Sequence, residues 1–562
     1  MTRLAGLVKT LNLFVVLCDL LGLVAVIAVV LGGASTPALI VLWVATLVVT
    51  VACVRGVVVA VADGQPGRAA IGQLLVSRLE LAIAALVLAS VEGASAAGII
   101  AIGILGVLAL VEQTMAKPVR SAKNAIANVP GWSVVPPAPT WANVLAAVNL
   151  ATVVVALVCV TFRLPTEVVW VAVAVALVCT IMLGVLILRY LVAFLRSERQ
   201  LSTIIADLNP AFLFHWQAPA GTAYQAAMWL PYLERIGKPY FVLVRTLANF
   251  AEVIKLTNAP VVLRVSLEEL DPLIVDSLKV AFYANTAVRN SHMIRFTQLQ
   301  HIQLNHGDSD KIASVNPTFR QYDKDFVAGQ AAIDRFAQHG VHMRADQFVI
   351  VGRPQLEDVN VAEAPVSSVA RPTVLYAPTW SGFYENSDYS SLPAGPEIVQ
   401  ALLDRGCRVV FRPHPYARRH PGNTAACDAI IDMLTKAGGD HVFGPQAEVQ
   451  MSITDCFNES DAMISDVSSV VSDYLISDKP FIMAAVSAPV AEFADEFPQA
   501  KAAYVVDVKK GQTTGLAEAL DAMLGDDPMA ELRRSVKAYY LGDVPPGQCV
   551  DYFVGEAMKF LV

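Results

Sequence analysis

Nearly all of the long apolar runs of this chain lie within its first 195 residues. A helix needs about 20 apolar residues to cross about 30 Å of hydrocarbon. The pattern therefore predicts membrane spans at 11–33, 38–54, 95–111, 142–161 and 168–188. A sixth run at 71–91 is interrupted by Arg78 and Glu80, so it is interpreted either as a span or as a helix lying in the membrane interface.

From residue 200 the pattern changes to short β-branched runs that alternate with helical periodicity, which is typical of parallel βαβ units. The first series predicts strands at 211–216, 239–244, 261–265, 279–284, 301–304, 325–329 and 347–352. The second series predicts strands at 373–378, 408–413, 441–444, 462–465, 481–485 and 502–507. Two doubly wound halves would place a ligand cleft at the carboxyl ends of their strands.

These patterns predict an N-terminal α-helical membrane domain at 1–199, followed by an α/β region with two Rossmann-like halves at 200–357 and 373–562. A linker rich in Pro, Ala and Ser at 358–372 would join the halves. The last helices, near 528–540 and 549–561, are expected to cross back over the first half.

Composition supports a chain that lies partly in lipid, because 55% of the 562 residues are hydrophobic and only 16% are charged. The net charge of −8, without a long basic run or zinc-finger spacing, argues against a nucleic-acid partner. The eight cysteines form no CxxC pair, which argues against a zinc site or a disulfide framework and fits a reducing compartment.

The cationic residues predict how the chain crosses the membrane. With six spans and the N-terminus inside, the outer loops carry only Arg163. The cytoplasmic side then holds Arg3, Lys9, Arg55, Arg68, Arg78, Lys117, Arg120, Lys123, Arg189, Arg196 and Arg199. This bias predicts a multi-pass protein of the cell membrane with everything after residue 200 in the cytoplasm. Asp19, inside the first span, is either a functional group or a structural partner for a residue such as Arg55.

Polar clusters follow five of the predicted strands, at 305–311, 352–355, 377–382, 412–415 and 465–469. Such clusters converge on one face of the fold and suggest a nucleotide diphosphate substrate. Ser468 and Ser469 could hold phosphate at a helix start, or could simply cap that helix. Arg412 offers a donor fork suited to phosphate, with His414 as a second donor; a structural Arg paired with a carboxylate is the alternative.

Four motifs occur in a fixed order along the chain: His306-Gly307 with Lys311, VLYAPTW at 374–380, RPHP at 412–415 and SDVSSVVSDYL at 465–475. This set resembles the CDP-glycerol:poly(glycerophosphate) glycerophosphotransferases, the teichoic-acid polymerase and primase family, over roughly residues 290–490. The resemblance implies a GT-B-like double Rossmann fold. It also implies transfer of a polyol phosphate from a CDP-activated donor to the hydroxyl of a membrane-linked polymer, with release of CMP. Asn305 and Asp308-Ser309-Asp310 depart from the family's usual WHGTPLK, which affects acceptor recognition more than donor binding.

The resemblance also implies roles for individual residues. His306 would act as the base on the attacking hydroxyl. Beside it, Asp308, although it departs from the family pattern, and Lys311 are predicted to belong to the catalytic group. Donor and phosphate binding would fall to Thr379, Arg412, His414, Asp466, Ser468 and Ser469. Asp308 and Asp310 could form a metal-binding DxD pair, but they are interpreted as capping a helix or orienting His306 and Lys311. No metal or cofactor is therefore assigned to the protein, and magnesium could accompany the donor.

The expected partners are CDP-glycerol or CDP-ribitol, a lipid-linked polymer acceptor, membrane lipid and, for an oligomer, further copies of the chain. Two other functions remain open at this point. One is a GT-B glycosyltransferase that uses a nucleotide-sugar donor, because fold alone does not choose the chemistry. The other is a non-catalytic, nucleotide-responsive export module, against which the absence of a Walker A sequence and the few intramembrane charges weigh.

Overall fold

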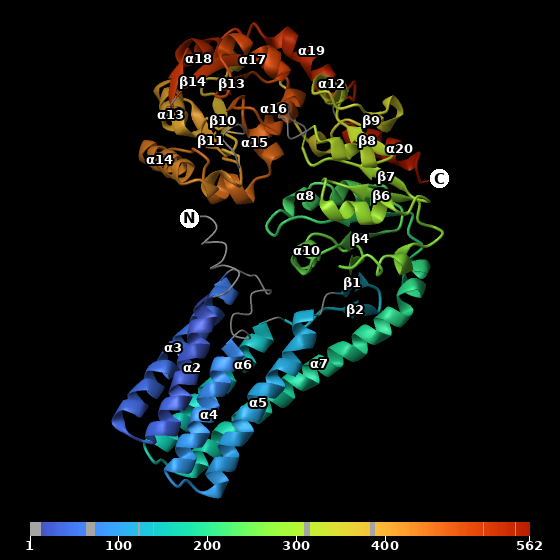
Figure 1. The fold of residues 1–562 in the computed structure, drawn as a ribbon. Helices are drawn as coiled ribbons and strands as arrows, with labels where there is room; N and C mark the ends of the chain where they lie inside the picture. The colour runs from blue at the N-terminus through green and yellow to red at the C-terminus, as the bar shows by residue number, and fades with distance from the viewer. Residues whose placement is uncertain are drawn as a thin grey trace. The chain divides into compact units, whose positions relative to one another are not determined.

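The structure is a computed structural model that describes residues 13–62, 74–121, 124–138, 140–307, 315–382, 388–509, 511–545 and 547–561 (Figure 1). The chain forms two compact units. The first unit comprises residues 1–204, 246–251 and 260–269, and the second comprises 205–245, 252–259 and 270–562. Each unit is described separately below.

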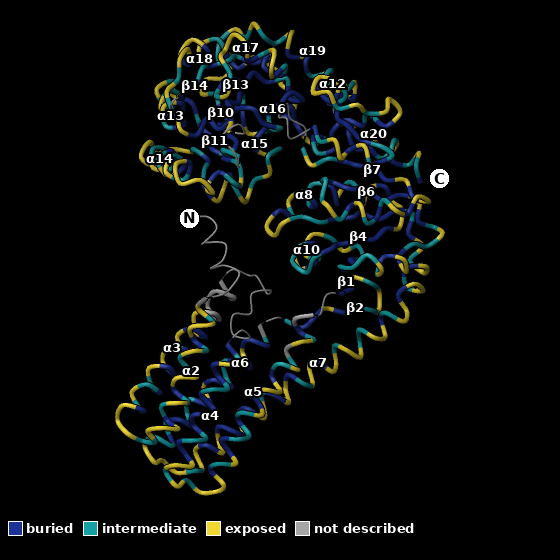
Figure 2. Tube along the Cα trace, in the orientation of Figure 1, coloured by how far each residue is buried: buried dark blue, intermediate teal, exposed yellow. Residues whose placement is uncertain are grey.

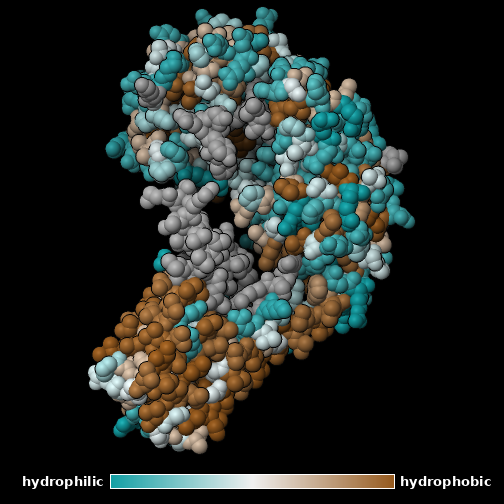
Figure 3. Space-filling model, in the orientation of Figure 1, coloured by the Kyte–Doolittle hydropathy of each residue, from teal (hydrophilic) through white to brown (hydrophobic). Residues whose placement is uncertain are grey.

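Long helices make up most of the first unit. Their bounds are α2 Leu13–Gly32, α3 Thr36–Ala62, α4 Leu75–Val91, α5 Ala96–Ser121, α6 Thr140–Thr161 and α7 Thr166–Leu208. Five of them, all except α4, are long and apolar enough to cross a membrane. Their outward surface is mainly hydrophobic, as Figure 3 shows. These five match the uninterrupted runs predicted from the sequence, and the doubtful run corresponds to the 17-residue helix α4.

The two charged residues that made this run doubtful lie on α4. Arg78 is buried and forms a bidentate ion pair with Glu112 of α5, at 2.7 and 2.9 Å. Asn149 of α6 donates to the same carboxylate at 3.1 Å. The guanidinium of Arg78 lies in the interior of the helix bundle, where Glu112 compensates its charge. The assignment of Arg78 to the cytoplasmic side stays a prediction.

Asp19 of α2 also has a structural partner, although it is not Arg55. Its carboxylate accepts hydrogen bonds from the backbone N–H of Ser77, at 3.1 Å, and from the Ser77 hydroxyl. Ser77 lies in the first turn of α4, where backbone N–H groups have no partner within the helix. The carboxylate therefore joins α2 to the start of α4.

Three short strands complete the first unit. The hairpin of β1 Ala125–Val129 and β2 Trp132–Val134 pairs antiparallel through β1 with β5 Val261–Leu263. The sequence pattern predicted β5 but not the hairpin. Its strands are short and follow a long apolar helix, and β1 is irregular at Asn128, which has a φ of 59°. The period-2 signal of strands is too short to recognise there.

The first half of the second unit is a parallel sheet. Its strand order is β4-β3-β6-β7-β8-β9, and each strand runs parallel to its neighbours. The strands are β3 Phe212–Trp216, β4 Tyr240–Val244, β6 Val280–Tyr283, β7 Gln300–Gln303, β8 Lys324–Val327 and β9 Phe348–Ile350. The helices along this part of the chain are α8 Tyr224–Ala227, α9 Leu230–Arg235, α10 Leu247–Val253, α11 Ser291–Ile294 and α12 Gln330–Gln338. All of these strands were predicted from β-branched and aromatic runs.

The second half holds a six-stranded sheet of order β11-β10-β12-β13-β14-β15. Its strands are β10 Thr373–Ala377, β11 Arg408–Phe411, β12 Ala462–Ser465, β13 Phe481–Ala485, β14 Tyr504–Lys509 and β15 Gln512–Thr514. The helices are α13 Gly395–Asp404, α14 Pro421–Ala437, α15 Ile453–Glu459, α16 Ser469–Tyr474, α17 Val490–Glu496, α18 Leu516–Leu524, α19 Ala530–Leu541 and α20 Cys549–Met558. The first five strands are parallel and largely buried (Figure 2).

Two details of this sheet differ from the prediction. Residues 441–444, predicted as a strand, contribute a single bridge between Val442 and Val410. Strand β15, which was not predicted, pairs antiparallel with β14 at the sheet edge. A polar QTT segment carries little strand signal of its own, so its pairing comes from the neighbouring strand.

The last two helices cross back onto the first half, as predicted. The backbone of Tyr540 in α19 passes so close to Gly329 that a Cβ at Gly329 would lie 2.6 Å from the Tyr540 carbonyl carbon. Phe553 of α20 packs on Trp229 and on Phe326, with ring centroids 5.4 and 6.3 Å apart. The two halves of the second unit therefore share a core.

Candidate functional site

His306 lies in the loop that follows β7, three residues after the last strand residue, Gln303. Its Nδ1 lies 3.0 Å from the carbonyl oxygen of Ala284, which follows β6. A carbonyl oxygen only accepts, so Nδ1 carries the proton and donates it to Ala284. The neutral ring then has its lone pair on Nε2, which is the nitrogen able to accept a proton from a substrate hydroxyl.

The surroundings of His306 favour this neutral ring. Its side chain remains accessible to solvent, yet it is surrounded closely enough by protein that burial lowers its pKa below the usual histidine value. The positive charge of Arg353 lowers the pKa of His306 further, and the hydrogen bond to Ala284 opposes both effects. His306 is therefore unprotonated at neutral pH, as a general base must be.

Asn305 fixes the loop that carries His306. Its φ of 60° lies in the left-handed region, which asparagine adopts more readily than most residues. The side-chain amide donates to Asp325 at 2.9 Å, and the backbone carbonyl accepts from the indole of Trp229 at 2.5 Å. The departure from the usual tryptophan at position 305 thus has a structural purpose in this chain.

The loop of His306 faces the SDVSS segment of the second half. A Cβ placed on Gly307 would lie 3.3 Å from Ser469 Oγ, tight enough that any side chain at 307 would displace this serine. Next to this approach, Arg353 after β9 donates two hydrogen bonds of 3.0 Å to the carboxylate of Asp473 in α16. Both residues of this pair are buried. The structure therefore brings Gly307, the neighbour of His306, close to Ser469 across the two halves, and the Arg353–Asp473 pair ties the halves beside them.

Asp466 and Ser468 have structural roles within the second half. The buried carboxylate of Asp466 accepts from the backbone N–H of Thr379 at 2.9 and 3.1 Å, and from the N–H and hydroxyl of Ser391, each at 2.9 Å. Ser468 is the N-cap of α16, and its hydroxyl accepts from the N–H of Val470 at 3.3 Å. Asp466 therefore joins the loops that follow β10 and β12, and the donor contacts of Asp466, Ser468 and Thr379 stay predictions.

Arg412 directs part of its guanidinium to backbone carbonyl groups. Its Nη1 donates to the carbonyl oxygens of Met451, at 2.7 Å, and of Ala447. The alternative interpretation of Arg412 was a structural arginine paired with a carboxylate, and the partners of Nη1 are carbonyl groups instead. The Arg412 backbone N–H donates to Tyr376 at 3.0 Å, which holds the RPHP segment next to the end of β10.

His414, the other predicted phosphate donor, is held by contacts within its own loop and with Trp380. Its Nδ1 accepts a hydrogen bond of 3.0 Å from the backbone N–H of Tyr416, so in the neutral ring the proton is on Nε2. The ring is stacked on Trp380, with centroids 6.1 Å apart and an interplanar angle of 24°. Thr379, Arg412, His414 and Asp466 thus lie at the carboxyl ends of the adjacent strands β10, β11 and β12.

Asp308 and Lys311, predicted as catalytic, lie outside the described residues, as does Asp310. Within the described part of the chain, no group of three or more His, Cys, Asp or Glu side chains is arranged to hold a metal ion. The metal-binding alternative for the DxD pair therefore stays a prediction.

Sequence reasoning missed the residues that hold the site together. Arg353 was included in the polar cluster at 352–355, and its position after a strand could have singled it out. Asp473, Asn305 and Trp229 carried no separate signal, because their partners are distant in sequence and become visible only in the fold.

Part of the chain is similar in sequence to known proteins. Residues 292–489 match the CDP-Glycerol:Poly(glycerophosphate) glycerophosphotransferase family. A teichoic acid ribitol-phosphate primase of Bacillus spizizenii is 25% identical over 189 residues, which cover 31% of this chain and 44% of the primase. The chain thus spans less than half the length of that curated relative.

Solved structures with similarity to this chain include the wall teichoic acid polymerase TagF. It covers 67% of this chain and 95% of its own, with 14% identity and a TM-score of 0.42. The S. aureus MnaA–UDP structure covers 62% of this chain and 96% of its own, with 12% identity and a TM-score of 0.40. The matched segment 292–489 holds His306, Arg353, the RPHP segment and the SDVSS segment. Through this segment, the chain is similar to the CDP-glycerol:poly(glycerophosphate) glycerophosphotransferase family.

Proposed function

We propose that this protein transfers glycerol phosphate, or a related polyol phosphate such as ribitol phosphate, from a CDP-activated donor to an acceptor hydroxyl in teichoic-acid-like polymer synthesis. The observation that carries the proposal is the approach of the His306 loop to Ser469 of the SDVSS segment. This approach supports a role for His306 as the base, because its Nδ1 donates to Ala284 and its lone pair is on Nε2, while the segment expected to hold the donor's diphosphate lies near its loop.

In the proposed reaction, Nε2 of His306 takes the proton of the acceptor hydroxyl. The acceptor oxygen forms a bond to the phosphorus that carries the polyol. The bond between this phosphorus and the bridging oxygen of the diphosphate breaks, and CMP leaves with that oxygen and its electron pair. Such a transfer depends mainly on positioning and on neutralising charge, which the guanidinium of Arg412 and the Nε2–H of His414 would supply. No step is assigned to a metal ion.

The proposal includes a membrane-embedded enzyme with a lipid-linked acceptor. Five helices are long and apolar enough to cross a bilayer, and α4 would be a sixth crossing because it packs with them. An even number of crossings would put the N-terminus and the catalytic unit on the same side, and the excess of Lys and Arg favours the cytoplasmic side. A catalytic unit held at this surface would meet an acceptor that cannot leave the membrane.

A donor panel tests the proposed reaction. Full-length protein in detergent with a membrane lipid extract is expected to release CMP from CDP-glycerol or CDP-ribitol. It should release no UDP from UDP-glucose or UDP-N-acetylglucosamine, because the site would recognise a polyol phosphate. Release of UDP without release of CMP would overturn the proposal and favour a glycosyltransferase. Nucleotide binding without turnover of any donor would favour the non-catalytic alternative.

The pH dependence of transfer tests the state of His306 separately. Burial and Arg353 lower the pKa of His306, and the base is active only when neutral. We therefore expect kcat/KM to fall with decreasing pH, with a midpoint below the ordinary histidine value of about 6.5. The measurement is the initial rate of CMP release as a function of pH between about 5 and 8, the range in which histidine titrates. A midpoint above 6.5 would contradict the assigned environment.

A further inference from the structure

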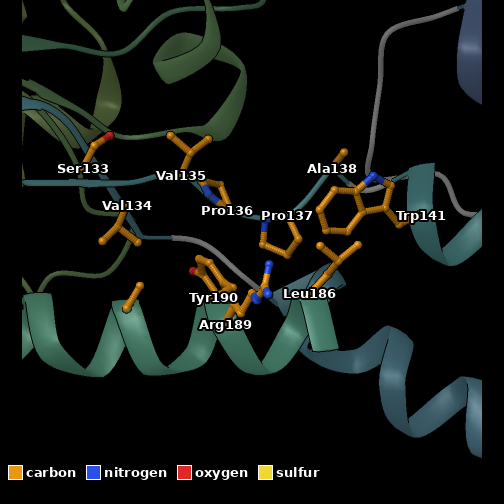
Figure 4. Close-up of a pocket in the computed structure, with 11 residues that line it drawn as sticks. Ser133, Val134, Val135, Pro136, Pro137, Ala138, Trp141, Leu186, Arg189 and Tyr190 are labelled. Carbon is orange, nitrogen blue, oxygen red and sulfur yellow. The ribbon is translucent and has the colours of Figure 1, made fainter. Parts of the chain in front are cut away.

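A groove in the first unit lies beside the long helix α7, far along the chain from the segment that carries His306. It has a volume of about 510 Å³ and is lined by Ser133, Val134, Val135, Pro136, Pro137, Ala138, Trp141, Leu186, Arg189, Tyr190 and Ala193. Figure 4 shows Leu186, Arg189 and Tyr190 on α7, with Pro136, Pro137 and Trp141 on the facing segment. The lining is mostly apolar, with Arg189 as its single cationic residue.

The position of this groove along α7 corresponds to the edge of a bilayer. Exposed apolar side chains begin on α7 at Val168 and continue to Leu195. Arg189 lies about 30 Å from Val168 at 1.5 Å per helical residue, which is the thickness of the hydrocarbon layer. Arg196 and Arg199 follow on the same helix. Trp141 and Tyr190 have the amphipathic rings that are enriched at this level of membrane proteins.

Arg189 can bind an anion. Its side chain is exposed, and no described carboxylate forms an ion pair with it. Tyr190 beside it donates its hydroxyl to the backbone carbonyl of Asn124, at 3.3 Å. A guanidinium presents several N–H donors and binds phosphate oxygens through charge-assisted hydrogen bonds. The adjoining surface of Leu186, Pro137 and Trp141 would exclude water from an attached alkyl chain.

We propose that this groove binds the phosphate head group of a membrane lipid, with Arg189 on the phosphate and the start of the lipid chain along Leu186 and Trp141. Its volume lies within the range of small-molecule sites and is large enough for a head group and part of a chain. The inference rests on the proposed function in one respect, namely that the lipid held here is the anchor of the acceptor. Binding itself requires no donor and no transfer.

The test measures binding of phosphatidic acid with brominated acyl chains to the full-length protein in neutral detergent, through quenching of tryptophan fluorescence. We expect saturable quenching that is largely lost in Trp141→Phe, because the bromines would lie next to this indole. Arg189→Gln should weaken binding by about tenfold or more, as expected for losing a hydrogen bond between charged groups. The matched control Arg196→Gln removes an exposed arginine of the same helix outside the groove and should change binding by less than about threefold.

Two further probes separate the sources of the phosphate. Brominated diacylglycerol, which lacks phosphate, should bind weakly, and inorganic phosphate should not compete. Equal binding by the wild type and Arg189→Gln, equal binding of diacylglycerol, or quenching that persists in Trp141→Phe would each overturn the inference. Effective competition by inorganic phosphate would also overturn it, since the groove would then be a site for the free anion. None of these results depends on the donor panel, so the inference and the proposed function can fail separately.

Discussion

Replacement of His306 by alanine is expected to lower kcat for CMP release by at least about 100-fold, the lower range for the loss of a positioned general base. The Nδ1–H of His306 donates to Ala284, so the lone pair lies on Nε2, the nitrogen that takes the proton of the acceptor in the proposed reaction. Alanine leaves space at this position but provides no proton-accepting group. The residual rate would come from donor binding and charge neutralisation by the other segment of the site.

The measurement is single-turnover CMP release with saturating CDP-glycerol, together with equilibrium binding of the donor. Binding should change little in His306→Ala, because the histidine is assigned to the acceptor hydroxyl. His342→Ala is the matched control, since His342 is also exposed and lies in the same half but outside the site. An unchanged kcat in a folded His306→Ala protein would remove the histidine from its assigned role. An equal loss in the control would show that the effect is not local.

The second large effect concerns the buried ion pair of the helix bundle. Glu112→Leu would leave the guanidinium of Arg78 without its carboxylate among apolar helices, where both side chains are at most 1% exposed. Breaking a buried pair in this way costs about 3–5 kcal/mol, because one charge stays buried and uncompensated. The double variant Arg78→Met with Glu112→Leu should recover most of this loss, because no charge remains.

The free energy of unfolding is measured by denaturant titration in mixed micelles for both single variants and the double variant. The exposed pair of Arg163 and Glu92 supplies the control, because its arginine is 80% exposed and its charges are screened by water. Glu92→Gln should therefore cost less than about 1 kcal/mol. If Glu112→Leu were as mild as this control, the pair would not be a major support of the bundle. A double variant no more stable than the single one would place the effect elsewhere.

Much of the fold was predictable because the strands of the second unit are marked by compact runs such as VLY at 374–376 and FIMAA at 481–485. These runs are buried on both faces, and burial of parallel strands requires β-branched and other apolar residues. The β1-β2 hairpin and β15 had no such signal, since they are short and polar or lie at a sheet edge. The segment 441–444 is apolar enough for a strand, but it pairs through one bridge only.

The sequence predicted where along the chain the site residues lie better than it predicted which side chains they contact. Polar residues after β7, β10, β11 and β12 were identified from the ends of the strand runs, and the fold gathers those of the second half at one sheet edge. The partner of a buried side chain is not encoded locally. Asp466 was predicted to contact the donor, and nothing in its SDVSS segment reveals that Thr379 and Ser391 occupy its carboxylate. The pair of Arg353 and Asp473 is hidden for the same reason.

The return of α20 to the first half has a consequence for folding cooperativity. Phe553 packs on the ring of Trp229, whose indole holds the carbonyl of Asn305 next to His306. The first parallel sheet therefore lacks part of its own core until a segment from beyond the second sheet has docked. A single proteolytic cut within 358–372 should accordingly leave two fragments that remain associated and unfold in one transition, since the first half lacks part of its hydrophobic core without α20.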